Sequence, residues 1–194
     1  FLSLPKYMVT ASGDNFIPPD SNKVFFPQLP GDKWIRVLPN QNHYIVREAP
    51  RLVSDTVESF YGAFLKGRPM PTLEWQEHPQ HFSTHLAIKS SLQPKSARLW
   101  QAINPLARDF RKTTDNPGVS RYVDSPITFK CRQTCKAQIE LSPPEKGWQA
   151  SFVDVRYDNA PFQDLVFTTR VFVTPDRYPE NKASIAGQAK KNIE

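Results

Sequence analysis

The sequence of 194 residues has no long hydrophobic run and no block of basic residues. A helix that crosses a bilayer needs roughly 18 consecutive apolar residues, and the N-terminus lacks the basic flank and apolar stretch of a signal peptide. The sequence therefore predicts no transmembrane segment. The net charge is +6, but Lys and Arg are interleaved with Asp and Glu, which argues against a nucleic acid partner.

Cysteine is scarce, since the chain contains only Cys131 and Cys135, within a segment that otherwise favours β-structure. A metal site would need further Cys or His at ligand spacing, and none follows. We expect a local disulfide, which would imply an oxidising compartment, and two reduced core thiols are the alternative.

Three of the four histidines, His78, His81 and His85, have the spacing H-x2-H-x3-H. Pro79 interrupts this stretch, so the imidazoles would not share a helical face, and no Cys or carboxylate pattern completes a tetrahedral set. We interpret them as loop and strand-edge residues. The sequence predicts neither a metal site nor a cofactor.

The first 68 residues have the pattern of an α/β fold. Residues 6–11 form a short apolar run without alternation, which is typical of a buried parallel strand. A short helix is expected at 21–26, with Asp20 or Ser21 as its N-cap, and a second strand at 33–38. A longer helix with one apolar face opens near Pro50, a favoured first-turn residue.

After Gly67, Pro69 and Pro71 the helical period stops, and a domain boundary is expected there. Turn signals then separate several β-like runs, which favours a β-sandwich of the immunoglobulin or fibronectin kind. These runs are 72–76, 84–90, 97–102, 128–141, 147–157 and 165–175. We therefore predict an α/β region at 1–68, a sandwich domain at 72–178 and a frayed tail at 179–194.

Asp14 and His43 are the candidate catalytic residues. Each follows a predicted parallel strand, and a carboxylate then a histidine at consecutive strand ends is how an α/β hydrolase holds its base. The competing carboxylate is Asp20, which we rank lower because we expect it to cap the helix at 21–26. No Gly-x-Ser-x-Gly nucleophile motif is present. The chain begins at Phe1 without an initiating Met, and we expect the serine on a missing N-terminal part.

The sequence resembles the PhoPQ-activated pathogenicity-related protein family over residues 4–175. The most specific stretch runs from Leu99-Trp100-Gln101-Ala102 to Ala107-Arg108-Asp109-Phe110-Arg111. Further matching segments are Gly13-Asp14-Asn15-Phe16, Pro19-Asp20-Ser21, Leu29-Pro30-Gly31-Asp32-Lys33 and Val37-Leu38-Pro39-Asn40 with His43. The resemblance implies a bacterial, exported α/β-hydrolase-like protein, periplasmic, surface-associated or secreted, with a C-terminal β domain.

Our first hypothesis is that this chain is the C-terminal portion of a serine hydrolase of ester or peptide-like bonds. Asp14 would orient His43, the N-terminal part of the same protein would supply the serine, and the chain alone would be inactive. The alternative is a non-catalytic secreted or surface interaction protein on a hydrolase fold, with a virulence-related role. We expect Arg108, Asp109 and Arg111 to be structural.

Overall fold

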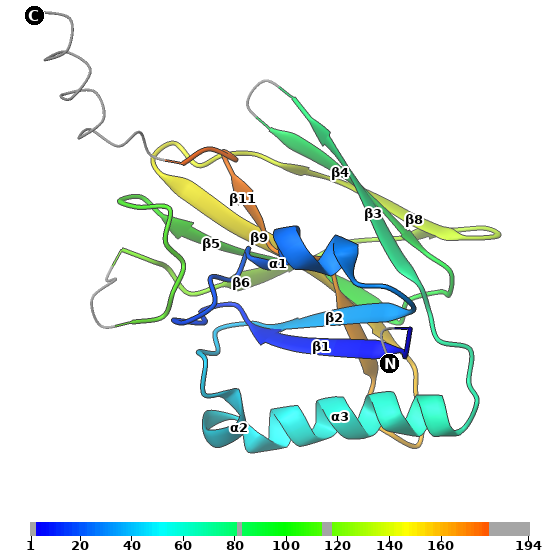
Figure 1. Ribbon diagram of the computed structural model, residues 1–194. Helices are drawn as coiled ribbons and strands as arrows, with labels where there is room; N and C mark the ends of the chain where they lie inside the picture. The colour runs from blue at the N-terminus through cyan, green and yellow to red at the C-terminus, as the bar shows by residue number, and fades with distance from the viewer. Residues whose placement is uncertain (1–2, 81–82, 114–117, 179–194) are drawn as a thin grey trace, which may run out of the picture.

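The protein is described by a computed structural model that covers residues 3–80, 83–113 and 118–178 (Figure 1). Within these ranges the chain is mostly antiparallel β-sheet with few helices. A two-stranded parallel sheet with its helices lies at one side, and two antiparallel sheets of five and four strands form the rest. The predicted tail at 179–194 lies outside the described residues.

The parallel pair consists of β1 (Lys6–Ala11) and β2 (Lys33–Leu38), both as predicted from their apolar runs. Between them lie the short helix α1 (Asn22–Phe25) and a 3-10 turn, η1 (Phe26–Gln28). After β2 come one turn of helix, α2 (Ile45–Glu48), and the long helix α3 (Pro50–Leu65). Gly67 follows the C-cap of α3, Lys66, and its φ of 62° is left-handed and favours glycine.

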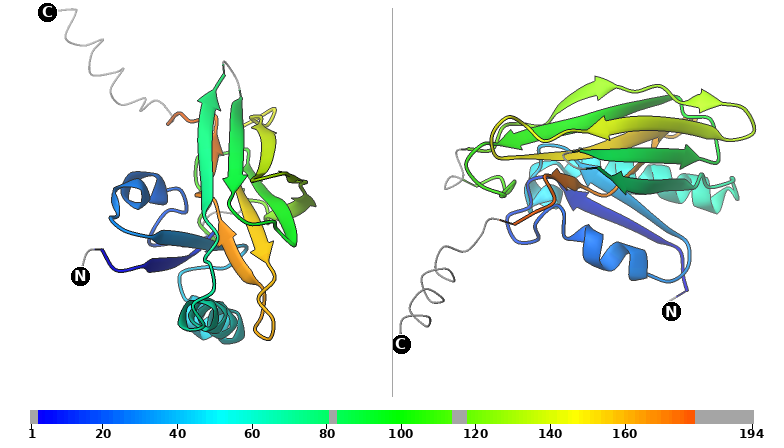
Figure 2. Two further views of the ribbon diagram at one scale, coloured as in Figure 1. Left: turned by 90° about the vertical axis from the view of Figure 1, so that its right-hand side faces the viewer. Right: turned by 90° about the horizontal axis from the view of Figure 1, so that it is seen from above.

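The two faces of the parallel pair are covered by different helices. On one face Tyr7 stacks on Phe60 of α3, with ring centroids 4.6 Å apart. On the other face Ile35 and Val37 pack with Phe26 of η1. The alternation of side chains along β2 therefore places α3 and η1 on opposite sides, and Figure 2 shows this layered arrangement.

The two antiparallel sheets pack face to face. The larger has the order β10 (Leu165–Thr168), β9 (Trp148–Tyr157), β5 (Ser96–Asn104) and β6 (Val123–Pro126), with β11 (Phe172–Thr174) also paired to β9. The smaller has the order β3 (Leu73–Pro79), β4 (Thr84–Ser90), β8 (Cys135–Leu141) and β7 (Lys130–Cys131). This arrangement is a β-sandwich, and its closer likeness to immunoglobulin or fibronectin domains stays a prediction.

Strand β9 takes part in both hydrophobic cores of the molecule. Val153 and Val155 face the smaller sheet, while Ala150 and Phe152 face the opposite way, into a core that includes Ile35. Both cores also contain residues from the parallel pair and its helices. The proposed boundary between residues 68 and 72 therefore lies between closely packed parts and stays a prediction.

The disulfide between Cys131 and Cys135 is confirmed. The two residues stand opposite each other in the β7–β8 hairpin, with Cα atoms 4.0 Å apart. This hairpin splits the predicted run 128–141, and residues 169–171 split the predicted run 165–175 into β10 and β11. No helix in the described part of the chain is long and apolar enough to cross a membrane.

Candidate functional site

Asp14 lies in the turn that follows β1, and its side chain is only 11% exposed. Its Oδ1 accepts hydrogen bonds from the backbone N–H groups of Phe16, at 2.8 Å, and Ile17, at 2.9 Å. A short acidic side chain that bonds backbone two and three residues further on is a common turn motif. The turn thus fixes the carboxylate without using an ion pair.

His43 contacts this carboxylate, as predicted. Its Nδ1 lies 3.1 Å from Oδ1 and 3.0 Å from Oδ2 of Asp14. An ionised carboxylate can only accept, so this contact favours the tautomer with the proton on Nδ1 and a lone pair on Nε2. Among the described residues no group hydrogen-bonds to Nε2, which is the nitrogen that a general base would use.

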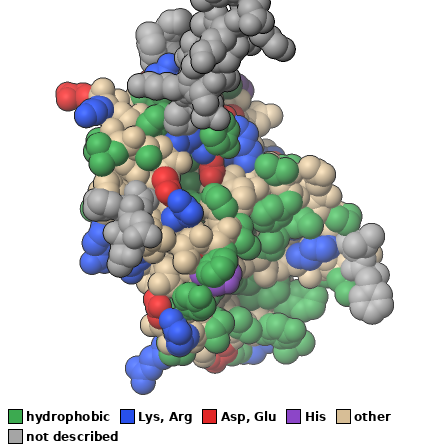
Figure 3. All heavy atoms as spheres, turned by 60° about the vertical axis from the view of Figure 1, so that its left-hand side comes forward, with side chains coloured by type: hydrophobic (Ala, Val, Ile, Leu, Met, Phe, Trp, Pro, Cys, Tyr) green, Lys and Arg blue, Asp and Glu red, His purple; other side chains and the backbone are tan. Residues whose placement is uncertain are grey.

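The imidazole is held from its sides by aromatic rings. Phe16 lies 4.5 Å from the His43 ring, centroid to centroid, and Tyr44 meets it edge-on at 5.5 Å. The His43 side chain is 38% exposed and borders a cavity of about 350 Å³ that Met8, Asp14 and Ile17 also line. Figure 3 shows that hydrophobic side chains gather on a large part of this side of the molecule.

The loops after β1 and β2 are connected by Asn40, whose role in the site was not predicted. Asn40 has a φ of 60°, and its backbone N–H donates to Ser12 Oγ at 2.8 Å. Its side chain donates to the Tyr122 carbonyl at 2.9 Å and accepts from the Tyr122 N–H at 2.8 Å. Asn40 therefore connects both site loops to the segment before β6.

The segment at 108–112 supports the same two loops from another side. The Lys112 backbone N–H donates to the Gly13 carbonyl at 2.8 Å, and Gly13 N–H donates to the Gln41 carbonyl at 3.0 Å. Asp109 and Arg111 form a bidentate pair, and the adjacent guanidinium lowers the pKa of the Asp109 carboxyl. These contacts agree with the structural role expected for the segment.

Asp20 has a different role from the one that we expected. The N-cap of α1 is Ser21, and no side chain caps the helix, so the expectation of an Asp20 cap was wrong. Asp20 instead pairs with Arg108 at 2.7 Å, and the Arg108 side chain is only 7% exposed. A buried guanidinium needs a charged partner, and the hydrogen bond between Arg and a carboxylate is among the strong ones. Asp20 is not the partner of His43.

The described histidines outside this pair form no metal site. His78 and His85 stand opposite each other in β3 and β4, and His85 Nε2 is 3.9 Å from Glu140 Oε2. His81 lies outside the described residues. Among residues 3–80, 83–113 and 118–178, no three His, Cys, Asp or Glu side chains are grouped as metal ligands.

Comparisons with known proteins add a family and a relative. Residues 1–111, which contain both site loops, match the family described as PhoPQ-activated pathogenicity-related protein. Autocrine proliferation repressor protein A of Dictyostelium discoideum is 24% identical over 199 residues. The alignment covers 94% of this chain, which spans 40% of the length of that relative. No solved structure matches.

Proposed function

Because the chain belongs to the PhoPQ-activated pathogenicity-related protein family, we propose that it supplies the acid and base of a serine hydrolase. Asp14 orients His43, and His43 takes the proton from a serine that lies on another part of the complete protein. The substrate has an ester or peptide-like bond. The contact between His43 Nδ1 and the Asp14 carboxylate is the observation that carries this proposal.

The arrangement suits this chemistry because each group has one task. The backbone of the 14–17 turn holds the carboxylate, which stabilises the imidazolium that forms when His43 accepts a proton. Nε2 has no partner among the described residues, and His43 lines the cavity, so we expect a hydroxyl to reach this nitrogen. A base of this kind contributes about 10²- to 10⁴-fold to the rate.

The parallel pair supports the proposal that this region is the edge of an α/β-hydrolase sheet. Two-stranded sheets are marginal alone, and parallel strands are normally buried within larger sheets. In the described part of the chain β1 pairs only with β2. Further parallel strands of the complete protein would pair with the free edge of β1 and bring the nucleophile toward His43.

Exposed apolar side chains support the proposal that another part of the protein covers the same region. Helix α3 packs on the sandwich through small residues such as Ser59, Gly62 and Ala63. Phe64 and Leu65, at the C-terminal end of this helix, are 45% and 76% exposed. An apolar face of this kind marks an interface, and we assign it to the remainder of the same protein.

Fluorophosphonate labelling of the complete protein tests the proposal, because this probe reports an activated serine without knowledge of the substrate. We expect one labelled serine, identified by mass spectrometry, and loss of labelling in His43→Ala. The matched control is His85→Ala, which removes a half-buried histidine on β4 and should label normally. Absence of labelling in the folded wild-type protein contradicts the proposal, as does equal labelling of wild type and His43→Ala.

A second candidate function is a secreted or surface interaction protein that has lost catalysis. The relative from Dictyostelium is named for repression of proliferation rather than for a reaction. The disulfide between Cys131 and Cys135 supports export from a reducing cytoplasm for either function. The residue at the nucleophile position of the complete sequence distinguishes the two functions. A serine there favours the hydrolase, and any other residue favours the interaction protein.

A further inference from the structure

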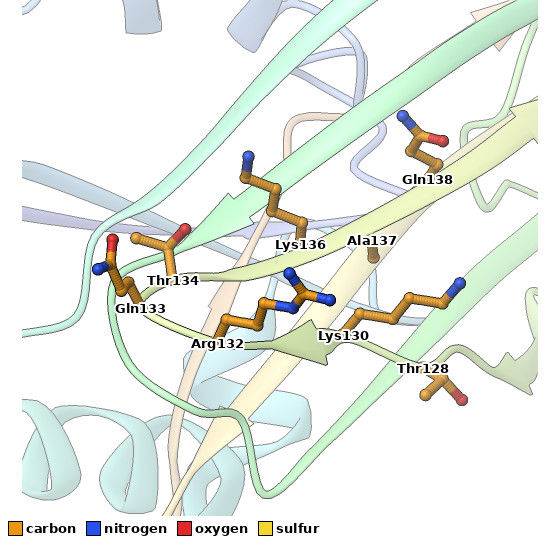
Figure 4. A pocket seen from close by; sticks show the side chains of 8 residues that line it. All are labelled: Thr128, Lys130, Arg132, Gln133, Thr134, Lys136, Ala137 and Gln138. Carbon is orange, nitrogen blue, oxygen red and sulfur yellow. The ribbon is translucent and has the colours of Figure 1, made fainter.

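The outer face of the smaller antiparallel sheet carries a hollow of about 900 Å³ beside the β7–β8 hairpin. Lys130, Arg132 and Lys136 line it together with hydroxyl and amide side chains, among them Thr128 and Gln138. In Figure 4 the guanidinium of Arg132 lies between the side chains of Lys130 and Lys136. This hollow lies on strands that do not contribute Asp14 or His43.

Three lysines of this face stand in one row across the sheet. Lys136 is directly opposite Lys130 on β7 and directly opposite Lys89 on β4. Like charges at such positions destabilise a sheet. Lys89 has an acidic neighbour, Glu74, at 3.6 Å. In the described ranges no carboxylate lies within 4 Å of the charged groups of Lys130, Arg132 and Lys136. A bound anion would relieve the repulsion among these three cations.

The disulfide fixes the shape of this cationic edge. Cys131 and Cys135 close a loop that contains Arg132, and the Arg132 N–H also donates to the Thr134 carbonyl at 3.2 Å. The loop therefore cannot move away from β8 without breaking a covalent bond. A site whose charged groups are held in place loses less entropy when a ligand binds.

The hollow continues along the same face toward β3. A second hollow of about 570 Å³ shares Lys136, Ala137 and Gln138 with the first, and Gln76, Lys89 and the acidic Glu74 also line it. Amide and hydroxyl groups suit the hydroxyls of a sugar, and the cations suit its acidic groups. The long shape fits a chain of several units.

The side chains that point outward from this face favour a glycan over other polyanions. Along β3, β4 and β8 they are charged residues of both signs, glutamines, histidines and Ala87, while the aromatic Trp75 packs against the core. Single-stranded nucleic acid binding uses exposed aromatic rings for stacking. Attachment to a membrane surface uses an apolar contribution beside the basic residues.

From these observations we propose that the outer face of β3, β4, β8 and β7 binds an acidic polysaccharide. Lys130, Arg132 and Lys136 bind its sulfate or carboxylate groups, and Gln76 and Gln138 bind its hydroxyls. This site is independent of the proposed hydrolase pair. It would hold the protein on an acidic glycan whether or not the protein is an enzyme.

Glycan binding by the complete protein tests the proposal. The probes are sulfated heparin oligosaccharides, polygalacturonate oligosaccharides, neutral dextran, phosphatidylglycerol vesicles and single-stranded DNA, each measured by calorimetry or by co-sedimentation. We expect an acidic glycan to bind and dextran not to bind. Each exposed ion pair contributes little, so all three cations are replaced together. The variant K130Q/R132Q/K136Q should weaken binding about tenfold or more.

The matched control is R51Q/K146Q/R177Q, which removes the same charge from exposed side chains elsewhere and should change Kd less than about twofold. Binding of only one glycan still supports the site and identifies its acidic group. Three results overturn the proposal: no binding to either acidic glycan, equal loss in both triple variants, or tighter binding to vesicles or DNA.

Discussion

The Asp14 carboxylate receives three hydrogen bonds, two from the backbone and one from the imidazole. Both backbone bonds are made within the same turn, so they orient the carboxylate independently of His43. The sequence indicated Asp14 because it follows a parallel strand. It could not show which carboxylate reaches His43, since Asp20 follows only six residues later and its partner, Arg108, is distant in the chain.

The protonation of His43 is the first prediction. Nδ1 should carry the proton in the neutral ring, because the carboxylate only accepts, and ¹⁵N NMR of labelled histidine distinguishes the two tautomers. Asp14→Asn should shift the ring toward the other tautomer, while Asp20→Asn should leave it unchanged. A wild-type ring protonated mainly on Nε2 would be incompatible with the proposed base.

The second prediction concerns Gly13, where the surrounding atoms leave no room for a Cβ. It would lie 2.8 Å from Lys112 Cβ and 3.0 Å from the Gln41 carbonyl oxygen. Gly13→Ala should therefore destabilise the complete protein by about 1–3 kcal/mol in urea unfolding. The loss should be smaller in a Lys112→Gly background, which removes one of the two contacts. An unchanged midpoint for Gly13→Ala would show that the loops separate freely.

At the scale of elements, the strands that carry the site were predictable and their connections were not. Strands β1 and β2 are short apolar runs bounded by turn residues, and that local signal was sufficient. Strand β6 was missed because its residues, Val123–Pro126, are all exposed and show no alternation. It exists because it pairs with β5, a contact between segments about 25 residues apart.

The support of the site loops was missed for a related reason. Asn40 reads as an ordinary loop residue, and only the fold brings its side chain to the backbone of Tyr122. A positive φ at a non-glycine residue favours asparagine, but the sequence does not report φ. The contribution of Asn40 depends on residues 82 positions away.

Asn40 gives the third prediction, which separates its conformation from its hydrogen bonds. Asn40→Ala loses both side-chain bonds and places alanine in the left-handed region, so it should lower the free energy of unfolding by about 2–4 kcal/mol. Asn40→Gly loses the same bonds without the conformational cost, and its loss should be smaller. Chemical denaturation of both variants checks the order. Equal losses would assign the whole effect to the hydrogen bonds.

At the scale of the whole molecule, the two hydrophobic cores join the N-terminal region to the sandwich. Trp34 and Ala63 share one core with Val153, and Ile35 shares the other with Phe152. The end of the helical period after Gly67 indicated an α/β region followed by a β-sandwich. It could not show how closely they pack, because that depends on which faces meet.

The fourth prediction follows from this shared packing. Residues 1–66 alone should not fold, because their buried side chains lose the partners on β9 and β10 and the parallel pair has only two strands. We expect no cooperative melt and no dispersed NMR spectrum from this fragment, in contrast to the complete protein. Cooperative folding of the fragment would show an autonomous domain.

The rate of fluorophosphonate labelling in Asp14→Asn, compared with Asp20→Asn, tests the central claim most directly. Both variants replace a carboxylate by an amide within the loop after β1, but only Asp14 contacts His43. We predict that Asp14→Asn of the complete, folded protein lowers the rate by orders of magnitude, with about 10⁴-fold as the loss in the Ser-His-Asp template. Asp20→Asn should lower it far less. Wild-type labelling in Asp14→Asn, or equal loss in the two variants, would contradict the assignment of Asp14 and His43 as the acid and base of a serine hydrolase.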